Sequence, residues 1–331
     1  MSPKRALALS TTLAALLSPL TAQAEDLSMV LNWVPTADHA PYFYAKQQGW
    51  YEAEGIILDI EAGRGSGAAV QRVAAGIAEV GVADLATVLL ARGEGANATA
   101  VMTVYANTPQ GFYWLKSSGI ETPEDFSGRS IGNPPADASR IMWPLFAKSV
   151  GITPDSVKFV NVSPQAKLTS LKSGAIDVTS DFYNEHDLKV REFGDDLGFV
   201  AWRNIGVNPY GNSIIVNETF LAEHTDTVAK FTAISQKAFG ACVSDFQPCL
   251  EALMSEVSGL DPDNQKDQWN RIKELMRDET TQTVALGAFS AERMAADYSM
   301  VETYFDLREP FDIETTYTNE FLDDSIKMTA E

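Results

Sequence analysis

Basic residues are scarce in this sequence. The 331 residues include 25 Lys and Arg against 45 Asp and Glu, which gives a formal net charge of −20. Nucleic acids are held mainly by clusters of Lys and Arg that contact the phosphate backbone. Because no such cluster stands out along the chain, we expect no nucleic-acid partner.

Cysteine and histidine are also rare. The chain has two cysteines, Cys242 and Cys249, and three histidines, His39, His186 and His224. Their spacing matches neither a zinc site nor a Cys-His nucleophile pair. The sequence also has no nucleophile elbow and no Walker phosphate loop. We therefore expect no metal site, no cofactor and no catalytic residues, so a binding protein is favoured over an enzyme.

The apolar run at the start of the chain, Ala6 to Leu20, is short for a membrane-spanning helix and is interrupted by polar residues. Lys4 and Arg5 precede it, and the small residues Ala22 and Ala24 follow it. This is the pattern of a secretory signal peptide. We predict cleavage after Ala24 and a protein that is exported to the periplasm.

Cleavage at this point has three consequences. The loss of two basic residues changes the formal net charge from −20 to −22. Glu25 rather than a cysteine follows the cut, so a lipid anchor is disfavoured and a free protein is expected. In an oxidising compartment, a local disulfide between Cys242 and Cys249 becomes the expected role of the two cysteines.

Length and pattern predict an α/β protein with two lobes. A chain of this length exceeds what one hydrophobic core usually serves. Short β-rich runs alternate with helical ones over residues 27–105, and a second alternation begins near residue 122. Such an alternation predicts, in each lobe, a mainly parallel sheet flanked by helices.

The strand expected at residues 212–217 is followed by helices that can pack back on the first unit. The chain would then cross between lobes near residues 113–120 and again near residues 206–212. We therefore assign residues 25–115 and 212–331 to lobe I and residues 116–211 to lobe II. A ligand is expected in the cleft between them.

A glycine-rich turn, Gly63-x-Gly65-x-x-Ala68, follows a predicted strand, and Asp84 ends the next one. This pattern is close to a dinucleotide-binding fingerprint. However, the turn is second in the sheet rather than first, and an exported protein has no nicotinamide pool. Two interpretations remain: the amides of Ser66 and Gly67 receive a polar or anionic ligand atom, or the turn is purely structural.

Two further segments place aromatic and polar side chains at the ends of predicted strands. In the first, Trp33 can stack on a heterocycle while Asn32 and His39 supply hydrogen bonds. In the second, Tyr183 can stack and the carboxylate of Glu185 can accept paired hydrogen bonds from an amino-heterocycle. Tyr210, near the second crossing, is a weaker candidate that rests on position alone.

Several motifs of the chain resemble the periplasmic substrate-binding proteins related to fungal thiamine-pyrimidine synthase, which have the two-lobed type II binding-protein fold. The matching motifs are Leu31-Asn32-Trp33-x5-His39-x-Pro41, Ala45-Lys46-x2-Gly49-Trp50-Tyr51-x2-Glu54-Gly55, Gly76-x4-Gly81, Lys116-x2-Gly119-Ile120, Gly174-x-Ile176-Asp177 and Tyr317-Thr318-Asn319-Glu320-Phe321-Leu322. The Asn-Trp start and the Tyr-Thr-Asn-Glu close are the most specific of them. The Tyr-x2-Glu-Gly element is shared with sulfonate, taurine and nitrate binders.

The resemblance also shows departures from the synthases. These enzymes carry a lysine that anchors pyridoxal phosphate and, four residues later, a histidine that is consumed. The aligned positions here are Ala83 and Thr87, and the region corresponding to their cysteine-rich stretch, Ile205 to Asn217, contains no cysteine. The resemblance therefore implies binding rather than synthase chemistry.

Together these observations predict the solute-binding component of an ABC importer, a monomer that delivers its ligand to permease subunits. The expected ligand is a small aromatic heterocycle, with a thiamine pyrimidine precursor of the hydroxymethylpyrimidine or formylaminopyrimidine type favoured and riboflavin as an alternative. The candidate ligand-binding residues are Asn32, Trp33, His39, Ser66, Asp84, Tyr183, Glu185 and Tyr210.

Two other hypotheses stay open. The same fold could bind a sulfonate, taurine or nitrate, and Arg64 or Arg140 would then be the residue to examine. The second hypothesis is that the protein is an enzyme that uses a nucleotide or pyridoxal cofactor.

Overall fold

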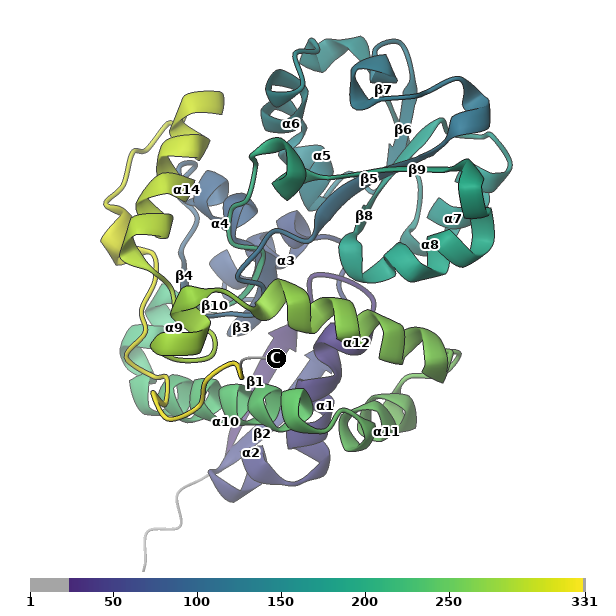
Figure 1. The fold of residues 1–331 in the computed structure, drawn as a ribbon. Coiled ribbons are helices and arrows are strands. Elements are labelled where there is room, and N and C mark those ends of the chain that lie inside the picture. The colour runs from purple at the N-terminus through teal and green to yellow at the C-terminus, as the bar shows by residue number, and fades with distance from the viewer. Residues whose placement is uncertain (1–23, 330–331) are drawn as a thin grey trace, which may run out of the picture.

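The computed structural model describes residues 24–329. The predicted signal peptide, apart from Ala24, lies outside the described residues. The described chain forms two five-stranded sheets, each covered by helices, and the two lobes lie side by side (Figure 1). Within residues 24–329, no helix is both long enough and apolar enough to span a membrane.

The sheet of lobe I has the strand order β2-β1-β3-β10-β4. Its strands are β1 (Glu25–Val30), β2 (Ile56–Glu61), β3 (Val80–Asp84), β4 (Ala98–Thr103) and β10 (Asn212–Asn217). Every residue of β3, β4 and β10 is buried, as expected for strands covered by helices on both faces.

The sheet of lobe II has the strand order β7-β6-β8-β5-β9. Its strands are β5 (Gln110–Leu115), β6 (Ser130–Asn133), β7 (Lys158–Asn161), β8 (Val178–Phe182) and β9 (Leu197–Ala201). The edge strand β7 is partly exposed along its whole length, in contrast to the buried centre of the sheet.

The two-lobed α/β fold is confirmed, and in each mixed sheet four of the five strands run in one direction. In lobe I, β10 runs antiparallel to β3 and β4, and in lobe II, β5 runs antiparallel to β8 and β9. In each lobe, the strand that follows a crossing enters the sheet against the direction of its neighbours. The parallel pairs are the strands connected by helices.

One predicted boundary is wrong. The strand over residues 110–115 was assigned to lobe I, but it is β5 and pairs with β8 and β9 in lobe II. The first crossing therefore lies at residues 104–109, before this strand, and not near 113–120. The second crossing lies at residues 206–211, between the 3-10 helix η8 (Trp202–Ile205) and β10.

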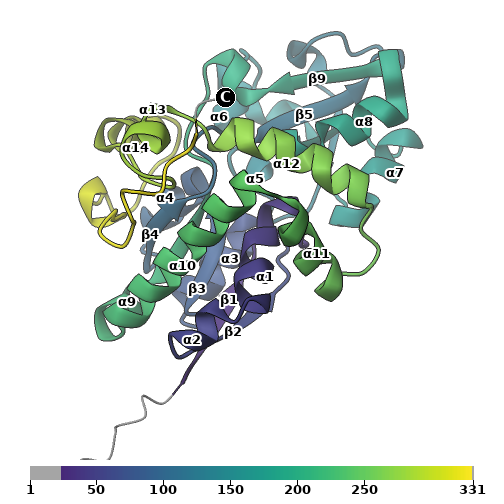
Figure 2. The same cartoon turned by 60° about the horizontal axis from the view of Figure 1, so that its bottom comes forward.

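Helices flank both sheets (Figure 2). They are α1 (Ala40–Gln47), α2 (Trp50–Ala53), α3 (Ser66–Ala74), α4 (Leu85–Arg92), α5 (Ala138–Ile141), α6 (Trp143–Ser149), α7 (Lys167–Lys172), α8 (His186–Phe193), α9 (Glu218–Glu223), α10 (Thr225–Ser244), α11 (Gln247–Glu256), α12 (Pro262–Met276), α13 (Glu279–Thr283) and α14 (Ala291–Tyr304). Residues 40–53 form two helices rather than one, because Gly49 adopts φ 68° and ends the first.

The helix α12 bridges the lobes. It packs on the 3-10 turn η1 (Ala37–His39) of lobe I and on α8 of lobe II. Arg271 of α12 makes a two-pronged ion pair with Asp187 of α8, with N–O distances of 2.9 and 3.1 Å. Both views place α12 along the junction of the two lobes (Figures 1 and 2).

The two cysteines and the motif at residues 317–322 have structural roles away from the cleft. Cys242 and Cys249 form the predicted disulfide, which ties the end of α10 to the start of α11, and both cysteines are fully buried. The motif at residues 317–322 continues the edge of the lobe I sheet, since Thr318 N donates to Ala100 O at 2.9 Å. Asn319 then holds both backbone groups of Phe289 at 2.9 Å.

Candidate ligand-binding cleft

A cavity lies between the two lobes and contains about 480 Å³ of space not filled by atoms, part of it open to solvent. Its walls come from the carboxyl ends of β1 and β8 and from segments that follow β1, β2, β6, β7 and β8, where ligands of open α/β sheets bind. The lining residues are Asn32, Trp33, Thr36, Asp38, Ser66, Asp137, Ala138, Ser139, Lys167, Asp181, Phe182, Asn184 and Glu185.

On the lobe I side, Asn32 and Trp33 follow the end of β1. The amide of Asn32 is held by His39, whose Nε2 lies 2.9 Å from Asn32 Oδ1. His39 is 1% exposed and does not line the cavity. It therefore positions Asn32 instead of offering its own ring to a ligand.

The carboxylate of Asp38 is buried against the same histidine. Asp38 Oδ1 lies 3.0 Å from His39 Nδ1 and accepts a hydrogen bond from Thr36 Oγ1 at 2.8 Å. Burial alone would raise the pKa of Asp38, but the charge and hydrogen bond of His39, with that of Thr36, lower it below its ordinary value. Asp38 is accordingly a charged but locally paired part of the wall.

Behind the wall, Asp84 connects the lobes. Its backbone N donates to Ser66 Oγ at 3.0 Å, and its Oδ2 accepts from Gln110 Nε2 of β5 at 3.1 Å. The Gln110 amide oxygen in turn accepts a hydrogen bond from Ser139, which lines the cavity. Burial raises the pKa of Asp84 to about 6, and Asp84 lies outside the cavity lining.

The lobe II wall carries a chain of buried charges. Lys167 Nζ lies 3.3 Å from Asp137 Oδ2 and 3.7 Å from Asp181 Oδ1. Lys189, which lies outside the lining, binds the other oxygen of Asp181 at 2.8 Å. Two lysines therefore balance the two aspartates of this wall.

Glu185 is the wall carboxylate with no cation in direct contact among the described ion pairs. Gln268 of α12 donates to Glu185 Oε1 at 2.9 Å. Burial raises the pKa of Glu185 to about 7, with the nearby charge of Lys189 opposing and that of Asp181 adding to the increase. A ligand that offers hydrogen-bond donors would find its acceptor here.

Four of the eight predicted residues line the cavity: Asn32, Trp33, Ser66 and Glu185. Tyr183 lies outside the lining because its ring is turned toward α12 and η8. Arg203 stands over the ring at 4.2 Å, and Arg271 donates to the phenol oxygen at 2.9 Å. In the cavity wall, the neighbouring Phe182 provides the aromatic surface instead.

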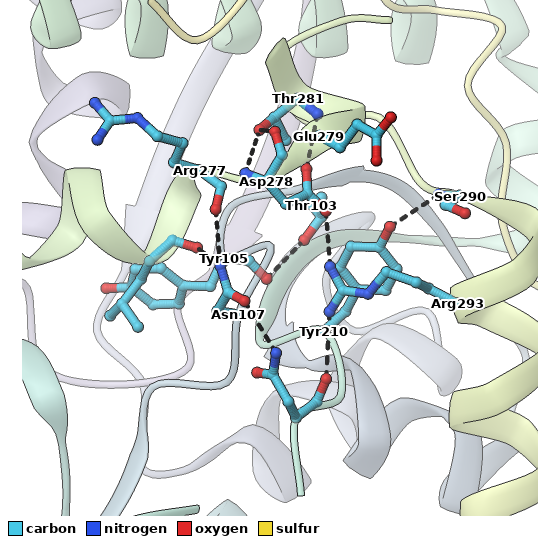
Figure 3. A network of polar contacts seen from close by, with 12 residues as sticks. Thr103, Tyr105, Asn107, Tyr210, Arg277, Asp278, Glu279, Thr281, Ser290 and Arg293 are labelled. Atoms are coloured by element: carbon cyan, nitrogen blue, oxygen red, sulfur yellow. Dashed lines mark hydrogen bonds and ion pairs between the residues drawn. The ribbon is translucent and has the colours of Figure 1, made fainter. Parts of the chain in front are cut away.

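Tyr210 belongs to the crossings between the lobes and not to the cavity (Figure 3). Its ring lies under Arg293 at 4.1 Å, and its hydroxyl accepts from Ser290 N at 2.8 Å. In the same network, Asn107 of the first crossing donates to Arg277 O at 2.9 Å and accepts from Asn208 of the second at 3.0 Å. These contacts tie both crossings to the C-terminal helices.

The glycine-rich turn makes close contacts with other backbone segments of the protein itself. A Cβ added to Gly63 would lie 1.8 Å from Leu31 O, and one added to Gly65 would lie 2.2 Å from Ala136 O of lobe II. Gly67 N donates to the same carbonyl at 3.1 Å. The amide proposed to receive a ligand at Gly67 is thus already used in a contact between the lobes.

The two arginines of the anion hypothesis lie away from the cavity lining. Arg64 is exposed at the surface. Arg140 binds Asn161 Oδ1 at 2.6 Å and stands over the ring of Phe159 at 4.8 Å. Neither arginine is placed to hold an anionic ligand in the cleft.

Comparison with known proteins identifies the family. The sequence profile of the NMT1/THI5-like family matches residues 36–247. This chain belongs to the NMT1/THI5-like family. Its fold is that of type II periplasmic binding proteins: the alkanesulfonate-binding protein SsuA of Xanthomonas axonopodis, solved with bound MOPS, superposes with a TM-score of 0.71 at 14% identity, over 90% of this chain and 99% of that one.

The NMT1/THI5-like family includes both binding proteins and synthases among the relatives of this chain. The formylaminopyrimidine-binding protein of Halalkalibacterium halodurans is 22% identical over 233 residues, 70% of each chain. Riboflavin-binding protein RibY of Chloroflexus aurantiacus is 22% identical over 305 residues, 90% of this chain and 86% of RibY. A hydroxymethylpyrimidine phosphate synthase of Legionella pneumophila is 23% identical over 306 residues, covering 90% and 93%.

Several lining residues of this family member escaped sequence reasoning. Asp137 follows the end of β6, so the same rule that found Glu185 after β8 could have found it. Lys167 begins the short helix α7, and the sequence does not show its partners, which are 30 and 14 residues away. In residues 24–329, no group of three His, Cys, Asp or Glu side chains is placed to hold a metal ion.

Proposed function

We propose that this protein is the periplasmic solute-binding component of an ABC importer and that it captures a small aromatic heterocycle. The favoured ligand is a thiamine pyrimidine precursor of the hydroxymethylpyrimidine or formylaminopyrimidine type. The observation that carries the proposal is the cavity between the lobes, because its lining includes both the indole of Trp33 and the carboxylate of Glu185. An aromatic ring can stack on the indole while its amino groups donate to the carboxylate.

The lining chemistry favours a donor-bearing ring over an anion. Four carboxylates line the cavity and no arginine does. A sulfonate or nitrate would have to approach Asp38, Asp137, Asp181 and Glu185 with the single cation of Lys167 among the lining residues to hold it. Relatives that bind formylaminopyrimidine and riboflavin support a heterocycle as well.

Binding without chemistry fits the residues at the synthase positions. Ala83 lies buried in β3, and Thr87 lies buried in α4. Neither side chain can form a Schiff base or act as the consumed histidine. Purified protein is therefore expected to show no pyridoxal absorbance near neutral pH, and such a band would favour an enzyme.

A calorimetric titration tests the ligand class. We expect hydroxymethylpyrimidine or formylaminopyrimidine to bind the purified protein with a measurable heat and to raise its unfolding temperature progressively as the ligand concentration increases. Riboflavin and taurine serve as comparison ligands. A response to taurine with none to any pyrimidine or to riboflavin would contradict the proposal and leave the fold unaffected.

Closure of the two lobes around the ligand is expected to depend on Gly65. Its φ of 121° and its approach to Ala136 O allow the glycine-rich turn of lobe I to touch lobe II beside the cavity. In Gly65→Ala, the added Cβ would push the lobes apart at this point. We expect about a tenfold loss of ligand affinity because the closed form becomes harder to reach, measured by calorimetry.

Gly76→Ala is the matched control for this substitution. Gly76 also has a positive φ, 66°, but an added Cβ would meet no atom within 4 Å. Backbone strain without a contact between lobes should lower the unfolding temperature and leave affinity nearly unchanged. Equal losses of affinity in the two variants would show that strain, and not the contact, matters.

A further inference from the structure

Lys167 occupies an unusual position in the cleft. It is 3% exposed, and its ammonium stands over the ring of Trp33 at 4.8 Å from the centroid. Lys167 belongs to lobe II and Trp33 to lobe I, so this contact spans the cavity. At this distance no ring fits between the two groups, so a heterocycle that stacks on Trp33 takes the other face of the indole or displaces the ammonium.

The carboxylates around Lys167 keep its amine protonated. Burial opposes its charge, but the carboxylates of Asp181 and Asp137 outweigh burial and raise the pKa of Lys167. Within the wall, Asp137 and Asp181 face Lys167 and Lys189, while Asp38 faces His39. The lobe II aspartates are thus matched by lysines of the protein itself.

We propose that Lys167 is a specificity-determining residue that reserves the cleft for neutral heterocycles with an acceptor atom and excludes cationic ones. This inference rests on the proposed function, because it assumes that an aromatic heterocycle stacks at Trp33. A ring nitrogen or carbonyl oxygen of a neutral ligand can accept a hydrogen bond from the Lys167 ammonium. A positively charged group would instead meet a buried ammonium at short range.

The same contacts predict how the charge balance of the cleft would change if Lys167 were removed. Asp137 would lose its one cation partner among the described ion pairs, and Asp181 would keep only Lys189. Two buried aspartates that lose a cation favour a ligand that brings a positive charge, whereas Glu185 keeps its hydrogen bond from Gln268 with or without Lys167. Removal of Lys167 should therefore reverse the preference of the cleft and not merely weaken it.

A matched pair of ligands separates charge from size. The probes are 4-amino-5-hydroxymethyl-2-methylpyrimidine, which is neutral near pH 7.5, and its 5-aminomethyl analogue, whose ammonium replaces the hydroxyl. Calorimetry gives Kd for both ligands with the wild type, Lys167→Met, Lys167→Gln and Lys172→Met. Lys172 lies on the same helix and is 66% exposed, so its replacement makes the same change in net charge outside the cavity.

The wild type should bind the neutral ligand more tightly, and the ratio of the two Kd values should shift by about tenfold or more toward the cation in Lys167→Met or Lys167→Gln. Lys172→Met should keep the wild-type ratio. Two outcomes would overturn the inference alone: a wild type that prefers the aminomethyl ligand, or folded Lys167 variants whose ratio is unchanged. If wild type binds neither pyrimidine nor riboflavin, the proposed function fails and this inference fails with it. If neither Lys167 variant gives a cooperative unfolding transition, the wild-type ratio decides the question.

Discussion

Replacing Trp33 by alanine is expected to weaken binding of the preferred heterocycle by about 100-fold. The indole offers the largest flat surface among the lining residues, and its loss removes both the stacking partner and the apolar area that the ligand buries. Calorimetry with the best ligand of the titration series measures the change. Trp33→Phe should recover part of the affinity because a smaller ring can still stack.

Trp50→Ala provides the control for loss of an indole from lobe I. Trp50 packs edge-on against Tyr44 and lies under the ammonium of Lys237, away from the cavity. Its removal should lower stability without a comparable loss of affinity. Wild-type affinity in a folded Trp33→Ala variant would show that the ligand does not stack on this indole, and the cleft would need another binding mode.

The part of the cleft that sequence could predict is the part that follows strand ends. Asn32, Trp33 and Glu185 lie just beyond β1 and β8, where a parallel arrangement brings polar side chains to one edge. The direction of a side chain after that point was not predictable. His39 and Tyr183 both stand in 3-10 turns, and their rings are turned into the protein by partners on other elements.

Pairing between distant elements explains the rest. The run Gln110–Leu115 has the same apolar character as a strand of either sheet, so nothing local shows which lobe it joins. Lys167 and Lys189 read as solvent-exposed helix residues, yet both are buried because Asp181 stands between them. A charged residue is expected to be exposed unless a partner of opposite charge is known. For these two lysines, only the fold shows which residue that partner is.

Substitution of Asp297 is expected to have a large effect on the stability of the protein. It is 6% exposed on α14, and its Oδ2 accepts a hydrogen bond from Tyr210 N at 2.9 Å in the second crossing. Burial raises the pKa of Asp297 to about 7, opposed by the hydrogen bond from Tyr210 and the charge of Arg293 and increased by the charge of Asp84. At the pH of most assays the folded state therefore holds a carboxylate that burial disfavours.

We expect Asp297→Asn to raise the free energy of unfolding at pH 8 by about 4 kcal/mol, with no gain at pH 4. In the wild type, the folded state retains a proton between the ordinary aspartate pKa near 4 and the folded value of about 7, while the unfolded state has lost it. Wild-type stability therefore falls as pH rises through this window and then levels off. The asparagine carries no charge, and its side-chain oxygen can still accept from Tyr210 N.

Urea unfolding at pH 4, 6 and 8 measures the difference between the two proteins, which should grow with pH. Glu302→Gln, on the exposed face of the same helix, changes the net charge equally and should show no such growth. Asp84 and Glu185, with pKa values raised to about 6 and about 7, remain in both proteins and make both less stable toward alkaline pH, so only the difference reports on Asp297. A constant difference across the three pH values would mean that Asp297 is ionised in the folded state throughout, with a partner strong enough to offset its burial.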